Sequence, residues 1–200
     1  MKFGRKMAAL ILAVVMVLMV LGACSEGSAS GDVSDNGVEA AQASSTEEGE
    51  KTGKNVYFAG PLFNQAEKEY NLKVVKVLED HGYTVFLPQR DGIEAAALEG
   101  KSEEEMTEMI FKLDHDEVYK ADIIFMNLDG RAPDEGACVE LGMGYAAGKR
   151  CYGFKTDTRS VEYGLDINPM ITGCMTKLFK NNDGDKMIEE LEKYLSENEL

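Results

Sequence analysis

From residue 55 to the C-terminus, apolar positions follow strand-like and helix-like patterns in alternation. Short apolar runs predict strands at 55–59, 83–87, 122–128, 151–155 and 176–179. Apolar residues that recur every three or four positions predict helices at 67–81, 102–120, 134–149 and 183–195. The run at 122–128 (DIIFMNL) is almost continuously apolar, as in a strand that is covered on both faces.

This alternation predicts the fold class. Strands that alternate with helices at this spacing form a parallel sheet, because each helix carries the chain back over the sheet to start the next strand. We therefore expect an α/β, doubly wound, flavodoxin- or Rossmann-like fold with a five-stranded parallel sheet and helices on both faces. Ligands bind such sheets at the carboxyl ends of the strands, so a site is expected in the loops that begin at Gly60, Pro88, Asp129 and Thr156.

The first 54 residues lack this pattern. Residues 1–23 carry three basic residues, an uncharged apolar run at 7–21 and then small residues, which is the arrangement of a secretory signal peptide. Residues 24–54 are mostly Ser, Gly, Ala, Glu and Asp and predict a disordered tether. The folded domain is therefore expected at 55–200.

The predicted signal peptide ends at a cysteine. Residues 21–24 (LGAC) resemble the lipobox of bacterial lipoproteins, in which the cysteine is diacylated and becomes the first residue of the mature chain. The resemblance implies lipidation at Cys24 and anchoring at the extracellular face of a bacterial cell membrane. The alternative is an uncleaved N-terminal anchor helix, although the apolar run is short for a membrane span.

The chain is strongly acidic, with a formal net charge of −15 that falls to about −18 once the signal peptide is removed. Such a surface repels nucleic acids and anionic lipids. The ligand is therefore expected to be neutral or to be held by local groups.

Neither a metal nor a cofactor is expected. Cys138, Cys151 and Cys174 have no CxxC spacing, and His81 and His115 lack the spacing of metal ligands. We expect the three cysteines to be buried free thiols.

The most informative single residue is Glu140, in the predicted helix at 134–149. Its neighbours on the same helical face are all small: Gly136, Ala137, Gly144 and Ala147. Small residues there are expected to leave a hollow beside the carboxylate, which is costly to bury without a partner. Alternatively, the glycines serve tight helix–sheet packing and Glu140 lies on a solvated face.

Several short segments resemble, in their order and spacing, the nucleoside 2-deoxyribosyltransferase family. They are 57–63 (YFAGPLF), 85–89 (VFLPQ), Asp114 eight residues before Asp122, 128–130 (LDG) with Asp134, 140–142 (ELG) and 168–170 (NPM). Each segment is weak alone, but together they span most of the predicted domain.

The resemblance implies three catalytic roles. Glu140 matches the nucleophile that forms a covalent 2-deoxyribosyl intermediate, and Tyr57 matches the phenol that orients this carboxylate. Asp114 matches the acid that meets the base and handles its proton. From the residues alone, Tyr57 could instead be a core aromatic, and Asp114 could belong to a solvated acidic face with Asp116 and Glu117.

The resemblance also implies a set of substrate-binding residues. Gln89 lines the base site, Phe63 lines the pocket in the loop that begins at Gly60, and Asp134 holds the sugar hydroxyls. Asn168 and Met170 match groups that a neighbouring subunit lends to the site, which implies a homo-oligomer. Asp134 could instead be a charge at a helix N-terminus, and Asn168 a turn residue before Pro169.

The implied function is transfer of a 2-deoxyribosyl group between nucleobases, with a deoxynucleoside and a free nucleobase as partners. Cleavage of an N-glycosidic bond with retention needs one attacking carboxylate and one proton donor. Three alternatives remain: a nucleoside hydrolase, a nucleoside 5′-monophosphate N-glycosidase and a non-catalytic nucleoside-binding lipoprotein. The first loop, 60–63 (GPLF), has no donor side chain for a phosphate, and a pure binder has no need of Glu140.

Overall fold

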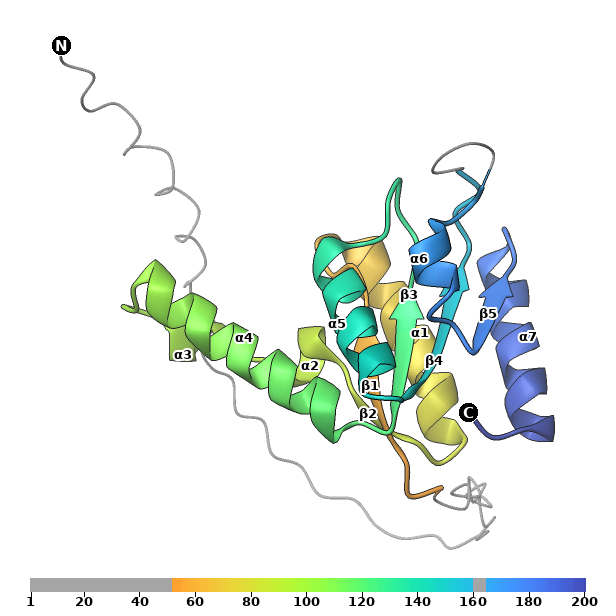
Figure 1. Cartoon of the computed structure of the whole chain (residues 1–200), viewed down its shortest axis with the longest axis horizontal. Coiled ribbons are helices and arrows are strands. Elements are labelled where there is room, and N and C mark those ends of the chain that lie inside the picture. The colour runs from red at the N-terminus through yellow and green to blue at the C-terminus, as the bar shows by residue number, and fades with distance from the viewer. Residues whose placement is uncertain (1–51, 160–164) are drawn as a thin grey trace, which may run out of the picture. The chain divides into compact units, whose positions relative to one another are not determined.

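The computed structural model describes residues 52–159 and 165–200. These residues form a parallel sheet of β1 (Asn55–Ala59), β2 (Thr84–Phe86), β3 (Ile123–Asn127), β4 (Arg150–Lys155) and β5 (Lys177–Lys180). The strand order is β2-β1-β3-β4-β5, and every neighbouring pair is parallel (Figure 1). This is the flavodoxin-like doubly wound order, so the predicted fold class is confirmed, and each of the five strands lies where the sequence predicts it to within two residues.

Helices cover both faces of the sheet (Figure 1). One face packs against α1 (Gln65–Asp80) and α7 (Gly184–Glu197), and the other against α4 (Glu103–Lys120), α5 (Glu135–Ala146) and α6 (Pro169–Thr172). Successive strand residues point to opposite faces, so Phe58 joins the first cluster and Tyr57 the second. The alternation in β1 therefore turns Tyr57 toward α4 and α5.

Capping boxes set the beginnings of α1 and α4. The Asn64 side chain accepts from the Glu67 backbone N–H at 3.0 Å, and the Glu67 carboxylate accepts from the Asn64 N–H at 3.1 Å. Ser102 and Glu105 make the same exchange at 3.2 and 2.8 Å, which confirms the helix start predicted at 102. Gly82, with a φ of 84°, ends α1 in the left-handed conformation that glycine favours.

The structure adds three short helices that the sequence pattern does not predict: α2 (Pro88–Asp91), α3 (Ala95–Leu98) and α6. A helix of four residues is too short to show a periodic apolar pattern. Pro88 follows β2 as expected, but it also begins α2, where its fixed φ suits the first helical turn. The helix predicted to run to 149 ends at Ala146.

The expectations for the N-terminus concern a different part of the chain. The predicted signal peptide at 1–23, nearly all of the predicted tether at 24–54 and Cys24 lie outside the described residues. Among residues 52–159 and 165–200, no helix has both the length and the apolar character that a bilayer span requires.

Candidate active site

Tyr57 and Glu140 meet between the sheet and α5. The Tyr57 hydroxyl donates a hydrogen bond of 2.8 Å to Glu140 Oε1. Tyr57 is fully buried in β1, and its ring stacks on Phe86 of β2 with centroids 5.6 Å apart. Tyr57 is therefore both the core aromatic and the carboxylate partner that the sequence offered as alternatives.

The environment of Glu140 alters its acidity. Burial is the main cause that raises the pKa of Glu140 to about 7; the hydrogen bond from Tyr57 opposes this rise, and the nearby charges of Asp114 and Asp134 contribute to it. The side chain is half-buried and takes no hydrogen bond at Oε2 from the described residues. The carboxylate is thus held at one oxygen and free at the other, and it gains its charge near neutral pH.

Asp114 is the second carboxyl group near this pair. It lies on α4, is half-buried, and forms no hydrogen bond or ion pair through its side chain with the described residues. Burial raises the pKa of Asp114, and its charge raises the pKa of both Tyr57 and Glu140. Asp116, two residues later, instead pairs with Lys112 at 2.6 Å on the solvated side. The acidic surface that the sequence suggested is therefore formed by Asp116, and Asp114 faces the site.

Asp134 has the capping role that the sequence offered as an alternative. It is the N-cap of α5, and Asp134 Oδ1 accepts from the Ala137 backbone N–H at 2.8 Å. Its Oδ2 takes no hydrogen bond from the described residues, and its charge contributes to the raised pKa of Glu140. Capping thus fixes a carboxylate less than two helical turns before Glu140 and leaves one oxygen available.

The structure does not form the hollow beside Glu140 in the way that the sequence predicts. Ala137 and Gly144 are buried against the sheet, and a Cβ on Gly144 would overlap the side chain of Ile124 in β3. Gly144 therefore allows α5 to approach β3 closely, which is the packing role that the sequence left open. Gly144 therefore leaves no hollow beside Glu140, because Ile124 fills the space at its Cα.

The first loop is held by close packing and by a chain of buried amides. A Cβ on Gly60 would lie 2.7 Å from the Cβ of Asn127, so glycine is needed for this approach. Asn127 donates to Asn71 Oδ1 at 2.8 Å, and Asn71 donates to the Pro61 carbonyl at 2.8 Å. Asn71 and Asn127 are both almost fully buried, and sequence reasoning missed them. The signal available was an amide within the otherwise apolar run at 122–128.

Gln89 belongs to the same network. Its Oε1 accepts from Asn71 Nδ2 at 3.0 Å, and its Nε2 donates to the Lys68 carbonyl at 2.9 Å. Both ends of the Gln89 amide are therefore occupied within the chain. A base that used Gln89 would have to share or replace these bonds.

The remaining predicted substrate residues lie at the surface of the chain. Phe63 is 75% exposed and Met170 is 78% exposed. Asn168 accepts from the Met170 backbone N–H at 2.9 Å and is the N-cap of α6, so it has the turn role that was kept as its alternative. Neither Asn168 nor Met170 is hydrogen-bonded to Tyr57, Asp114 or Glu140 within the described chain.

The three cysteines of the described chain differ in their burial. Cys151 is buried, as expected, whereas Cys138 and Cys174 are only half-buried, and all three are free thiols. In the described part of the chain, no three His, Cys, Asp or Glu side chains are grouped so that they could hold a metal ion.

Comparisons with known proteins agree with this arrangement. The family model for nucleoside 2-deoxyribosyltransferase matches residues 56–196. The chain is similar to the solved structure of a 2-deoxyribosyltransferase from Bacillus psychrosaccharolyticus, with 31% identity and a TM-score of 0.56 over 70% of this chain and 91% of the other. A comparison with curated protein sequences finds no match.

Two more distant structures share the fold. A conserved protein from Enterococcus faecalis V583 is 24% identical, with a TM-score of 0.55 over 70% of this chain and 98% of the other. A 2-desoxiribosyltransferase from Leishmania mexicana is 20% identical, with a TM-score of 0.51 over 73% of this chain and 99% of the other.

Proposed function

Because this chain belongs to the nucleoside 2-deoxyribosyltransferase family, we propose that it transfers a 2-deoxyribosyl group from a deoxynucleoside to a free nucleobase. The observation that carries the proposal is the hydrogen bond from Tyr57 to Glu140 with Asp114 nearby and unpaired. Family membership supports chemistry at an N-glycosidic bond, and these three side chains supply the groups that such chemistry needs.

In the first step, Glu140 acts as the nucleophile. The Tyr57 hydroxyl fixes Oε1, so Oε2 can form a bond to the anomeric carbon while the bond from that carbon to the base nitrogen breaks. Asp114 gives its proton to the departing base, which leaves as a neutral molecule. The product is a glycosyl ester of Glu140 and an ionised Asp114.

In the second step, another nucleobase attacks the anomeric carbon. Its nitrogen loses a proton to Asp114 as the ester bond to Glu140 breaks, which restores both side chains to their starting states. The mechanism requires Glu140 to be ionised when it attacks and Asp114 to hold a proton when the base departs. The pKa of Asp114 is raised by burial, which favours its protonated form.

The sugar and the base are bound by the surrounding residues. Asp134 Oδ2 accepts a hydrogen bond from a sugar hydroxyl, and Phe63 covers the pocket when substrate is bound. The first loop, which begins at Gly60, brings no basic or hydroxyl side chain toward the site, so a free nucleoside is preferred to a nucleoside 5′-monophosphate. Gln89 contributes to the base site by exchanging one of its internal hydrogen bonds.

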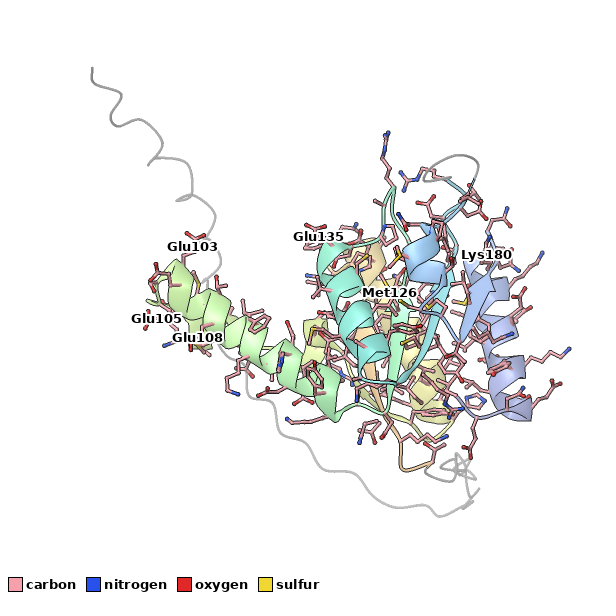
Figure 2. All side chains as sticks on the ribbon, viewed as in Figure 1. Glu103, Glu105, Glu108, Met126, Glu135 and Lys180 are labelled. Carbon is pink, nitrogen blue, oxygen red and sulfur yellow. The ribbon has the colours of Figure 1, made fainter. Side chains whose placement is uncertain are left out.

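A second copy of this chain completes the site. The faces of α4 and α5 that do not pack on the sheet expose large apolar side chains: Ile110, Phe111, Tyr119, Val139 and Tyr145. The far end of α4 carries Glu103, Glu105 and Glu108, well away from the sheet (Figure 2). Large apolar side chains exposed on two neighbouring helices favour association, and a symmetric partner would bring its own Asn168 and Met170 to Glu140.

The proposal also includes the N-terminal part of the chain, which anchors the domain. Cys24 is lipidated after removal of residues 1–23, which places the domain at the extracellular face of a bacterial membrane. Mass spectrometry of the N-terminal peptide of the membrane-bound protein tests this directly. A diacylated Cys24 is expected, and an intact residue 1 would support the uncleaved anchor helix instead.

The test of the function is base exchange. The purified domain is mixed with a deoxynucleoside and a second free base, and the products are separated by chromatography. A new deoxynucleoside is expected. Free sugar without a new nucleoside would show a hydrolase, and unchanged substrate with measurable binding would show a non-catalytic binding protein.

A further inference from the structure

The lysine that follows α5 joins the end of this helix to the end of α4. The backbone N–H of Lys149 donates to the Gly144 carbonyl at 3.0 Å, which fixes residue 149 to the last turn of α5. Its ammonium group donates to the Tyr119 carbonyl at 2.9 Å and to the Ala121 carbonyl, both at the end of α4. Lys149 is therefore bound to α5 through its backbone and to α4 through its side chain.

The carbonyl groups at the end of α4 suit a cation. The last carbonyls of a helix lack partners within the helix and carry partial negative charge, so a lysine beside them is favoured. Ala121 is buried and Lys149 is half-buried, so Lys149 supplies a donor where water has little access. Among residues 52–159 and 165–200, no side chain of α4 forms a hydrogen bond or an ion pair with a side chain of α5. Lys149 is thus the polar link between the two helices in this part of the chain.

This link lies away from the proposed substrate site. Ile123 and Arg150, which begin β3 and β4, are register partners, so the ends of α4 and α5 meet at the amino edge of the sheet (Figure 1). Ligands of doubly wound sheets bind at the opposite, carboxyl edge. Lys149 therefore acts on the reaction through the positions of other groups and not by contact with the substrate.

Each of the two linked helices carries one of the proposed reacting groups. Asp114 lies five residues before Tyr119 on α4, and Glu140 lies nine residues before Lys149 on α5. The two carboxyl groups are close enough for the charge of Asp114 to raise the pKa of Glu140. A movement of α4 relative to α5 changes their separation, and a misplacement of about 1 Å at a reacting group can cost roughly 10²-fold in rate.

The helix that carries Asp114 is the less firmly held of the two. Glu140 is bound by Tyr57 of the sheet, and Gly144 lets α5 approach β3 closely. In α4, by contrast, Val118 is the only buried residue. Loss of the Lys149 link should therefore displace α4, and Asp114 with it, while Glu140 keeps its place.

We propose that Lys149 is a positioning residue of the transferase reaction, which holds α4 against α5 so that Asp114 reaches the departing base while Glu140 attacks the sugar. This inference rests on the proposed function, because it assigns Lys149 a part in the same reaction. Lys149 touches neither the sugar nor the base, so its loss should lower kcat and leave the KM for the deoxynucleoside nearly unchanged.

Steady-state kinetics of base exchange give the first readout. Lys149→Met removes the ammonium group and keeps the length of the side chain, and we expect kcat to fall by about tenfold or more. Lys149→Arg keeps a cation that can donate to both carbonyls and should recover most of this loss. The matched control is Lys120→Met, because Lys120 pairs with Glu117 of its own helix and should retain the wild-type kcat.

A substrate that needs no acid separates positioning from a general loss of structure. The base of 7-methyl-2′-deoxyguanosine already carries a positive charge, so it departs as a neutral molecule without a proton from Asp114. Lys149→Met should therefore cleave this nucleoside nearly as fast as the wild type does. It should cleave 2′-deoxyguanosine slower than the wild type by about tenfold or more, as measured by chromatography of the released base.

The possible outcomes distinguish this inference from the proposed function. If the wild type cleaves neither nucleoside, both are wrong. If the wild type cleaves 2′-deoxyguanosine and Lys149→Met does so equally fast, or if the folded variant loses the same activity on both nucleosides, only the positioning role is wrong. Thermal unfolding shows whether the variant is folded. Lys149→Gln, whose amide can still donate to one carbonyl, gives the same comparison if Lys149→Met does not fold.

Discussion

The hydroxyl of Tyr57 and the carboxylate of Glu140 are joined by a hydrogen bond of 2.8 Å, although the two residues are 83 positions apart in the sequence. The contact exists because β1 alternates its side chains between two cores and α5 crosses the face toward which Tyr57 points. It is therefore a property of the fold, and it places a buried phenol where it can hold a carboxylate in one orientation.

The first prediction concerns the nucleophile. Glu140→Gln keeps the shape of the side chain and an oxygen that can accept from Tyr57, but it removes the attacking oxygen. We expect base exchange to fall by roughly 10³-fold or more while the variant remains folded. Intact-mass analysis after incubation with a deoxynucleoside should show a glycosyl adduct on the wild type and none on the variant. Glu135→Gln, at the exposed start of the same helix, is the control and should retain both activity and adduct.

The second prediction concerns pH. Glu140 must be ionised to attack, so kcat/KM should rise with pH through the Glu140 pKa of about 7. The hydrogen bond from Tyr57 lowers this pKa, so Tyr57→Phe should move the rise to higher pH. Tyr194→Phe, which changes a tyrosine of α7 on the opposite face of the sheet, should leave the profile unchanged. A Tyr57→Phe profile that coincides with the wild type would separate Tyr57 from the ionisation of Glu140.

The third prediction links the same group to stability. The pKa of Glu140 is about 7 in the folded chain and about 4.5 for an ordinary glutamate, so the folded state binds more protons between these values. The contribution of Glu140 to stability is therefore lost as pH rises through this window. Glu140→Gln should be more stable than the wild type by roughly 2–3 kcal/mol above pH 7, and by much less near pH 4.5. Urea unfolding at both pH values, with Glu135→Gln as control, measures the difference.

Much of this arrangement follows from local pattern. The five strands and four long helices were predictable because their apolar spacing is regular and Ser102 carries a capping box. Glu140, Tyr57 and Asp114 were predictable from the family resemblance, and the structure brings them together. The short helix α6 was not predictable, because its four residues are positioned by the side chain of Asn168 rather than by an apolar face.

The errors have physical causes as well. Its spacing places Gly144 on the same helical face as Glu140, yet Gly144 packs against the sheet. The neighbouring strand decides which face of the helix is buried. The link between Asn71 and Asn127 joins residues 56 positions apart, and no local spacing reveals such a pair. Long-range contacts of this kind appear only once the strands are in register.

The fourth prediction tests that amide link. Asn71→Ala removes the donor to Pro61 and Gln89 and leaves the Asn127 amide without its acceptor. We expect the free energy of unfolding to fall by roughly 2–4 kcal/mol, because several buried polar groups lose their partners. The KM for the acceptor base should rise more than kcat falls, because Gln89 is no longer held. Asn198→Ala, which removes one exposed hydrogen bond on α7, is the control and should change neither quantity appreciably.

The fifth prediction uses two glycines of α5 that differ only in what faces them. A Cβ at Gly142 meets nothing within 4 Å, whereas a Cβ at Gly144 overlaps Ile124. Gly142→Ala should raise the free energy of unfolding by roughly 0.5–1 kcal/mol, since alanine favours the helix. Gly144→Ala should lower it by roughly 1–3 kcal/mol, because α5 must move away from β3. Ile124→Ala should then relieve the effect, so that Gly144→Ala costs less in that background than alone. Any shift of α5 carries Glu140 away from Tyr57, so Gly144→Ala should also slow base exchange, whereas Gly142→Ala should not. Equal losses of activity in the two variants would show that the packing of Gly144 on Ile124 does not hold Glu140 against Tyr57.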